Sequence, residues 1–202
     1  MKRFSGSHLV QDRKQLAALA SAVRQEIVDA LSQMGTVPVS ELAATLGRPA
    51  DALYYHLHAL KKAGLVVHAG YREGVRKEEL IHVASSDLKL LYKPGKGGNS
   101  KQIIAIAGSM LRLGIRDFGQ AIQDEGVSVT GPGRELWALR RTGRLTAEEL
   151  PSVNRAIEEL ARTVAKPNGK GRLYGITILL TPLDHRARKN RQKAGSQKGT
   201  NQ

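Results

Sequence analysis

The feature that most constrains the fold is a change of hydrophobic period near Gly64. Before this glycine, apolar side chains recur every three or four positions, which is the spacing of one face of an α-helix. After it, Leu65-Val66-Val67-His68 is typical of a strand, and Glu79–Ala84 predicts a second strand that returns along the first. The intervening residues 70–77 are expected to form a loop. The pattern therefore predicts helices packed beside a β-hairpin.

Three helices are predicted before the hairpin. The first carries an apolar stripe through residues 16–34, and a short second helix covers about residues 40–46. After a tight turn at Gly47, a third helix runs from about Pro49 to Ala63. Proline suits the first helical position because its missing N–H would be unpaired there, and Gly64 suits the position just beyond the last turn.

The second half of the chain is predicted to add a smaller α/β domain. A long amphipathic helix is expected over residues 100–124, and the capping-box pattern Thr146-Ala147-Glu148-Glu149 predicts the start of another helix. Strands are expected at 127–129, at 135–139 and at Leu173–Leu180, the last of them buried.

These elements predict an α+β fold divided into five segments. The tail has almost no apolar residues, so it cannot offset the entropy of ordering and we expect it to be disordered. The expected segments are a loose N-terminal arm at 1–15, a helical and hairpin domain at 16–92, a glycine-rich linker at 93–99, a C-terminal dimerisation or effector domain at 100–183, and the basic tail at 184–202.

The charge of the chain predicts a polyanionic partner. Its 32 Lys and Arg against 18 Asp and Glu give a net charge of +14, which favours salt-dependent binding to phosphates. Membranes and ribosomes are polyanions too, so charge alone does not name the partner. The chain has no cysteine, no apolar run of about 18 residues and no secretory leader at its start. We expect a cytoplasmic protein that does not bind membranes.

The stretch Val39–Val67 resembles the ArsR-type winged helix-turn-helix family of transcriptional regulators. The matching residues are Ser40-Glu41-Leu42-Ala43, Leu46-Gly47, His56-Leu57, Leu60 and Ala63-Gly64-Leu65-Val66. Tyr54-Tyr55-His56-Leu57 looks like a variant of that family's Ser-x-His-Leu pattern. The resemblance extends over about residues 16–86. The chain departs from the family's metal sensors because it has no cysteine pair, so we expect no metal and no other cofactor.

The resemblance implies sequence-specific binding of double-stranded DNA by a homodimer, with an unidentified small-molecule effector as a further partner. The helix at 49–63 would enter the major groove, and the loop Gly70–Lys77 would be the wing that lies on the DNA backbone. Tyrosine and histidine can hydrogen-bond base edges or phosphates, and lysine and arginine neutralise phosphates. The residues expected to face DNA are Pro49, Ala50, Asp51, Tyr54, Tyr55, His58 and Lys61 on the helix, and Tyr71, Arg72, Arg76 and Lys77 in the wing.

Individual residues on this helix have competing interpretations. Adjacent helical positions point about 100° apart, so we expect one of Tyr54 and Tyr55 to touch DNA and the other to pack on the domain, with Tyr55 favoured as the reader. Asp51 must either accept from a cytosine amino group or lie beyond reach of the phosphates. His56 is expected to be a half-buried structural residue. We expect the recognition helix and the wing to be basic.

Three other functional classes can be compared with the sequence. The paired glutamates belong to the capping box and to a solvated helix face, and no nucleophile lies beside a base, so the sequence does not predict an enzyme. A winged helix that docks a protein is a second interpretation. Non-specific binding of nucleic acid or RNA through the basic tail is a third.

Overall fold

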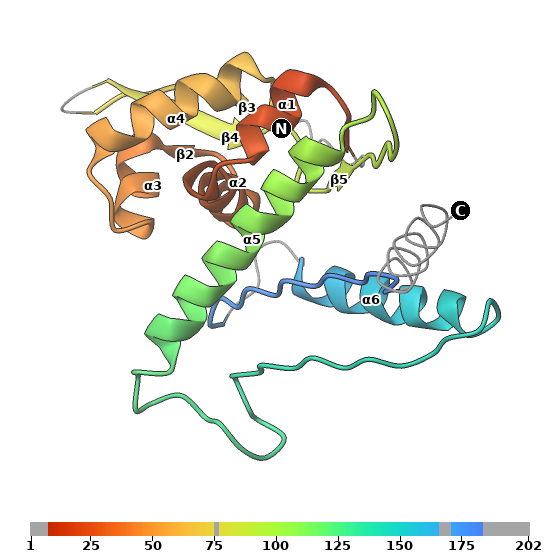
Figure 1. Ribbon diagram of the computed structural model, residues 1–202. Coiled ribbons are helices and arrows are strands. Elements are labelled where there is room, and N and C mark those ends of the chain that lie inside the picture. The colour runs from red at the N-terminus through yellow and green to blue at the C-terminus, as the bar shows by residue number, and fades with distance from the viewer. Residues whose placement is uncertain (1–7, 75–76, 166–170, 184–202) are drawn as a thin grey trace, which may run out of the picture.

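The computed structural model describes residues 8–74, 77–165 and 171–183, and it combines helices with two small sheets. In Figure 1, α1 to α4 and the strands gather at one end, while α5 runs from them to a separate C-terminal region. The elements are, in order, β1 (His8–Val10), α1 (Arg13–Leu19), α2 (Ala22–Met34), β2 (Val37–Pro38), α3 (Val39–Thr45), α4 (Ala50–Lys62), β3 (Val66–Arg72), β4 (Glu78–Val83), β5 (Leu88–Leu90), α5 (Ser100–Ala121) and α6 (Leu150–Val164).

The hydrophobic core lies entirely within the N-terminal end. It is built from leucine, isoleucine, valine and alanine side chains of α1 to α4 and the strands, and Ile106 of α5 closes it from one side. Among the described residues, no apolar side chain beyond Ile106 is buried. The helices at 40–46 and 49–63 are confirmed as α3 and α4, each within a residue of the predicted bounds.

The hairpin predicted after Gly64 is confirmed as β3 and β4. These strands pair antiparallel, with Val66 opposite Val83 and Arg72 opposite Glu78, and β2 extends the sheet on the other edge of β4. β3 continues to Arg72, so the loop expected over 70–77 is shorter than predicted. Its residues 75 and 76 lie outside the described part of the chain.

The single helix expected over residues 16–34 is wrong, because the chain breaks between α1 and α2. Ser21 is extended (φ −107°, ψ 125°) and begins α2. The buried side chain of Gln25 donates to the carbonyl of Leu19 across this break and to the carbonyl of Ile106 on α5, at 2.5 and 3.2 Å. The apolar stripe continues through the break because both helices pack on the same core, so periodicity alone gave no sign of it.

The expectation that residues 1–15 form a loose arm is wrong for residues 8–15. Strand β1 pairs in parallel with β5, with His8 opposite Leu88 and Val10 opposite Leu90, and Val10 is fully buried. Asp12 then accepts from the backbone N–H of Lys14 and caps α1. A strand of only three residues is too short to show a period, which is why it was missed.

Residues 93–99, expected to be a linker, form a turn held by one buried side chain. Asn99 Oδ1 accepts from the backbone N–H of Lys93 at 2.8 Å, and Asn99 Nδ2 donates to the carbonyl of Leu91 at 2.7 Å. Gly98 is required here, since a Cβ at this position would lie 1.9 Å from the carbonyl oxygen of Lys93. The turn sets the direction in which α5 leaves the strands, and α5 then packs on α1 and α2.

The two C-terminal helices are confirmed, but the three C-terminal strands are not formed. The capping box is present: Glu149 N–H donates to Thr146 Oγ1, and Thr146 N–H donates to the Glu149 carboxylate. Residues 173–180, expected to be a buried strand, are exposed and unpaired, because no described segment lies beside them as a strand partner. No described helix is long and apolar enough to span a membrane.

The Asn99 turn leads to a first prediction. Replacing Asn99 with Ala removes two partly buried hydrogen bonds, to the backbone N–H of Lys93 and to the carbonyl of Leu91, which should lower the unfolding free energy by about 0.5–1.5 kcal/mol for each bond. Urea unfolding followed by circular dichroism measures the change. Asn154→Ala, at an exposed position of α6, is the matched control and should leave stability nearly unchanged. Equal stability of the two variants would show that the turn does not hold α5 in place.

Candidate nucleic-acid interface

The candidate interface begins with the way α4 is anchored. Helices α3 and α4 are joined by a tight turn in which Gly47 has φ +60° and the backbone N–H of Arg48 donates to the carbonyl of Ala43 at 3.0 Å. A left-handed φ favours glycine, because a side chain is strained there. Leu53, Leu57 and Leu60 of α4 are at most 1% exposed and fix this helix on the core.

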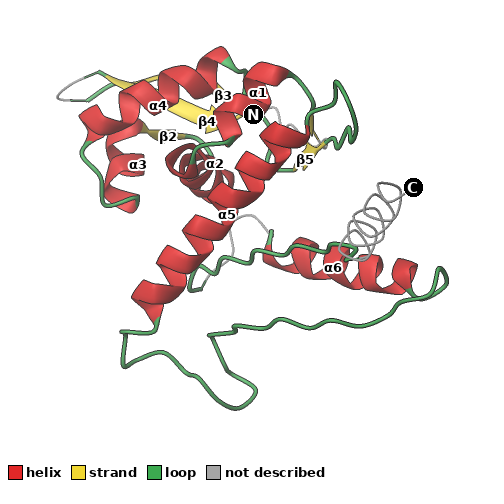
Figure 2. Ribbon diagram, in the orientation of Figure 1, coloured by secondary structure: helices red, strands yellow, loops and turns green. Residues whose placement is uncertain are grey.

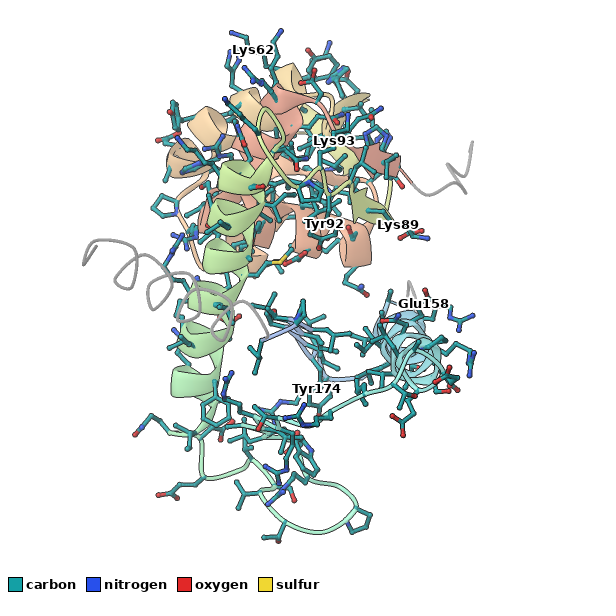
Figure 3. All side chains as sticks on the ribbon, turned by 45° about the vertical axis from the view of Figure 1, so that its right-hand side comes forward. Lys62, Lys89, Tyr92, Lys93, Glu158 and Tyr174 are labelled. Atoms are coloured by element: carbon teal, nitrogen blue, oxygen red, sulfur yellow. The ribbon has the colours of Figure 1, made fainter. Side chains whose placement is uncertain are left out.

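The opposite face of α4 carries polar and aromatic side chains into solvent. Tyr54 is 51% exposed and Tyr55 is 75% exposed, so the expectation that one of them packs on the domain is wrong. The buried stripe is narrow, and at about 100° per residue both tyrosines fall outside it. Asp51 and His58 are exposed on the same side. Lys62 projects from the end of α4, away from the C-terminal region (Figure 3).

His56 lies at the edge of this face and is partly buried. Its ring meets that of Tyr55 edge to face, with the centroids 5.3 Å apart. Burial, together with the positive charges of Arg24 and Arg48, lowers the pKa of His56. The imidazole is therefore neutral at neutral pH, as a half-buried structural residue should be. Among the described residues, no group of three or more His, Asp and Glu side chains could hold a metal ion.

The β3–β4 hairpin meets the end of α4 through one carboxylate. Glu79 on β4 accepts from the ammonium of Lys61, and His68 Nδ1 lies 3.0 Å from the same carboxylate oxygen. The ring of Tyr71 stacks edge to face on His68, and Lys77 Nζ lies 4.5 Å from the Tyr71 ring centroid. Lys61 was expected to face DNA, but its ammonium is engaged within the protein and serves to fix the hairpin against α4.

Arg72 is also engaged within the protein. Its guanidinium pairs with Glu78 at 2.7 Å and lies 3.9 Å from Glu41 on α3. Of the cations on α4 and the hairpin, Lys62 and Lys77 make no ion pair with a described residue. Arg76 lies outside the described residues. Pro49 is exposed at the N-cap of α4, and Ala50 beside it is half-buried.

The helix at 49–63 and the loop at 70–77 hold five Lys and Arg against two Asp and Glu, so their sequence is basic as expected, and Glu78 and Glu79 of β4 offset part of that charge. Residues 8–92 contain ten Lys and Arg and nine Asp and Glu, so this whole end of the molecule has a net charge of only +1. The remaining +13 lies in residues 1–7 and 93–202. Glu79 pairs with Lys61 and Glu78 pairs with Arg72, so the acidic residues of β4 lie beside these cations.

A comparison with known protein families identifies part of this structure. Residues 19–69 match the family model of a helix-turn-helix domain. The match runs from the end of α1 into β3, about a quarter of the chain, and such domains occur in DNA-binding regulators in general. No curated protein matches the chain. The predicted fold is confirmed at this level: a mixed structure of helix and sheet, with the helix-turn-helix domain followed by a smaller C-terminal region.

One carboxylate that sequence reasoning missed ties the helix-turn-helix domain to α5. Glu26 of α2 is 15% exposed and accepts from Arg48, in the turn before α4, at 2.9 Å and from Arg116 of α5 at 2.7 Å. Arg116 also pairs with Asp117 at 2.6 Å. Partners separated by 22 and 90 positions cannot be inferred from local spacing.

The electrostatics of Glu26 follow from these contacts. Burial by itself raises the pKa of Glu26, but the hydrogen bonds and charges of Arg116 and Arg48 more than offset it, so the pKa lies below its ordinary value of 4.5. A group with a lowered pKa contributes stability that is present above its ordinary pKa and is lost as the pH falls through the lowered one.

Glu26→Gln should therefore destabilise the protein in a pH-dependent way. The amide cannot accept two charge-assisted hydrogen bonds, so we expect the unfolding free energy at neutral pH to fall by about 1–3 kcal/mol. The difference from the unmodified protein should shrink as the pH falls below 4.5. Urea unfolding over a pH series measures both effects. Glu125→Gln, at an exposed carboxylate without an ion pair among the described residues, is the control. A difference that stays constant with pH would contradict this account of Glu26.

Proposed function

We propose that the chain is a sequence-specific, double-stranded-DNA-binding transcriptional regulator of the ArsR type that acts as a homodimer. Helix α4 enters the major groove and the β3–β4 hairpin is the wing on the backbone. The observation that carries the proposal is the outer face of α4: Tyr54, Tyr55 and His58 project together into solvent from a helix whose other face is fixed by three buried leucines. An α-helix presented in this way fits the major groove.

The proposed interface divides its contacts between base reading and backbone positioning. Tyr54, Tyr55 and His58 supply hydrogen-bonding groups for base edges, while Lys62, Lys77 and Tyr71 lie where phosphates would pass. Pro49, Ala50 and Asp51 at the start of α4 form the part of the helix that reaches deepest into the groove. With a net charge of +1 over residues 8–92, this domain attracts DNA only weakly by charge. Much of its affinity must then come from contacts that depend on sequence.

The homodimer belongs to the proposal because one short helix contacts few base pairs. Two copies related by a two-fold axis read two half-sites about one turn of DNA apart, which multiplies specificity. An unidentified small-molecule effector and a cytoplasmic location complete the proposal.

Selection from randomised duplex DNA tests the function. The purified full chain is incubated with the pool at physiological salt, and the bound fraction is sequenced after several rounds. We expect enrichment of a two-fold symmetric motif. Binding without enrichment that disappears steeply with salt would replace the proposal with non-specific binding of polyanions. Absence of binding under all conditions would favour a winged helix that docks a protein.

The exposed face of α4 leads to a prediction about binding to the enriched DNA motif. Tyr55→Ala combined with His58→Ala removes two exposed side chains from α4 without touching its buried leucines, so the domain should remain folded. We expect binding to the motif to weaken about a hundredfold, because each direct contact contributes about 1–3 kcal/mol, while binding to unrelated duplex changes little. Fluorescence anisotropy measures both affinities. Tyr92→Ala, at a tyrosine that lies after β5 and is 66% exposed, is the control. Unchanged specificity would exclude this face of α4 as the reader.

The basic tail gives a separate prediction. Residues 184–202 lie outside the described residues, and their sequence carries a net charge of +5. Deleting them should weaken binding to all duplexes by a similar factor and flatten the dependence of log affinity on log salt, since each lost phosphate contact removes about 0.9 from the slope. The ratio of specific to non-specific affinity should be preserved. Complete loss of binding would identify the tail as the main nucleic-acid-binding element.

A further inference from the structure

The arginine segment, residues 134–144, runs as an extended stretch between α5 and α6, and most of its side chains are exposed. Its charged residues are four arginines and one glutamate, with no lysine, which gives a net charge of +3. Residues 136–145 make no backbone-to-backbone hydrogen bond with a described residue. In Figure 1 this stretch lies at the end of the molecule opposite α4, so it is separate from the proposed duplex interface.

Three arginines of this segment have no carboxylate partner. Arg140, Arg141 and Arg144 make no ion pair with a described residue, and their one hydrogen bond runs from Arg141 to the carbonyl of Arg140 at 3.1 Å. Other arginines of the chain do pair with carboxylates: Arg48, Arg72, Arg116 and Arg172. Three guanidinium groups within five residues therefore keep their positive charge uncompensated, which favours an anionic ligand.

The carboxylates nearest in sequence are engaged by other groups. Glu135 accepts from Arg172 at 3.1 Å and from the hydroxyl of Tyr174 at 2.6 Å. On the other side of the segment, the carboxylate of Glu149 accepts from the backbone N–H of Thr146 at 2.8 Å, as part of the capping box that begins α6. These contacts hold the negative charges at the two ends of the segment and leave its middle positive.

The segment also carries the only tryptophan of the chain, Trp137. Its side chain is 65% exposed, and the guanidinium carbon of Arg134 lies 4.6 Å from the centroid of its ring. Arg134 is itself held, because its Nε donates to the carbonyl of Val129 at 2.6 Å. An open indole ring supported by a fixed cation offers a stacking surface for a planar aromatic ligand such as a nucleic-acid base.

We propose that the arginine segment binds single-stranded nucleic acid, with Arg140, Arg141 and Arg144 on the phosphates and Trp137 stacked on a base. A guanidinium group can donate two parallel hydrogen bonds to one phosphate. Bases of a single strand have free faces for stacking, whereas those of a duplex are already stacked on one another. An acidic peptide would match the arginines but would give the indole no base to stack on.

Because Trp137 is the sole tryptophan, its fluorescence tests the site directly. The full chain is titrated with an oligouridine of about 12 nucleotides, a length within the range that single-strand sites cover. We expect the tryptophan emission to be quenched to saturation as a base stacks on the indole. Duplex DNA of the same length should change the emission little. Absence of quenching by the single strand, or equal quenching by the duplex, would overturn the inference.

Removal of the unpaired arginines tests the phosphate contacts. Arg140→Ala with Arg144→Ala should weaken binding of a labelled oligouridine about tenfold, measured by fluorescence anisotropy. The slope of log affinity against log salt should flatten by about 1.4, since each phosphate contact to a single strand contributes about 0.7. Arg155→Ala with Arg162→Ala removes the same charge from exposed positions of α6 and is the control. An equal loss in both variants would indicate general charge attraction and overturn the inference.

Two further variants separate stacking from packing and this site from α4. Trp137→Leu should weaken binding of the oligouridine about tenfold, whereas Trp137→Phe keeps an aromatic ring and should retain most of the affinity. Unchanged binding by Trp137→Leu would overturn the stacking contact.

Tyr55→Ala with His58→Ala should leave single-strand binding intact, so failure of the proposed duplex function and failure of this inference can be told apart. Loss of single-strand binding in that variant would place the ligand on α4 and overturn the inference. Circular dichroism verifies that each variant is folded.

Discussion

The burial of three leucines of α4 is the interaction on which the rest of the molecule depends. Leu53, Leu57 and Leu60 are enclosed by α1, α2, α3 and the strands, and Ile106 of α5 completes the same core. Because this stripe is narrow, most of the α4 surface remains outside the core. The same packing that stabilises the domain therefore determines which side chains α4 can present to a partner. Burial of one face of an amphipathic helix is enough to hold its opposite face towards solvent.

The parts of the fold that depend on local pattern could be predicted from the sequence. The spacing of the leucines predicted α4, Gly64 predicted its end, and the capping box at Thr146 predicted the start of α6. Each of these features depends on a few neighbouring residues. The break at Ser21, the three-residue strand β1 and the Asn99 turn could not be predicted in this way. The break and β1 are set by contacts with segments far along the chain, such as Gln25 with Ile106, 81 positions away. The Asn99 turn depends on side-chain hydrogen bonds to Lys93 and Leu91, which no hydrophobic period marks.

The candidate site shows the same division between local and distant causes. That Tyr55 and His58 are exposed followed from helical spacing. That Lys61 and Arg72 are engaged by Glu79 and Glu78 did not, because the pairing depends on how β4 lies against α4. The carboxylates of β4 also offset part of the positive charge of α4 and of the loop after β3. The sequence of one helix or strand shows only its own lysines and arginines. The carboxylates that neutralise them belong to another element.

The net positive charge of the chain lies almost entirely outside the helix-turn-helix domain, and this has a consequence for the specificity of the proposed DNA binding. The affinity of a protein for any duplex is set mainly by phosphate neutralisation, whereas discrimination is set by base contacts. A nearly neutral helix-turn-helix domain with +13 elsewhere in the chain can vary these two quantities independently. In the proposed regulator, basic segments outside the domain would keep the protein near DNA, and α4 would determine where it binds.

Helix α5 joins the N-terminal core to the C-terminal region. It is held at its start by Asn99 and at Ser109 by a hydrogen bond to the carbonyl of Ala20, and Arg116 reaches Glu26, which also holds the turn before α4. Its 22 residues span about 33 Å at about 1.5 Å per residue. The direction of α5 relative to the core is therefore set by contacts of Asn99, Ser109 and Arg116, which are spread along the helix, and this direction determines where the C-terminal region begins.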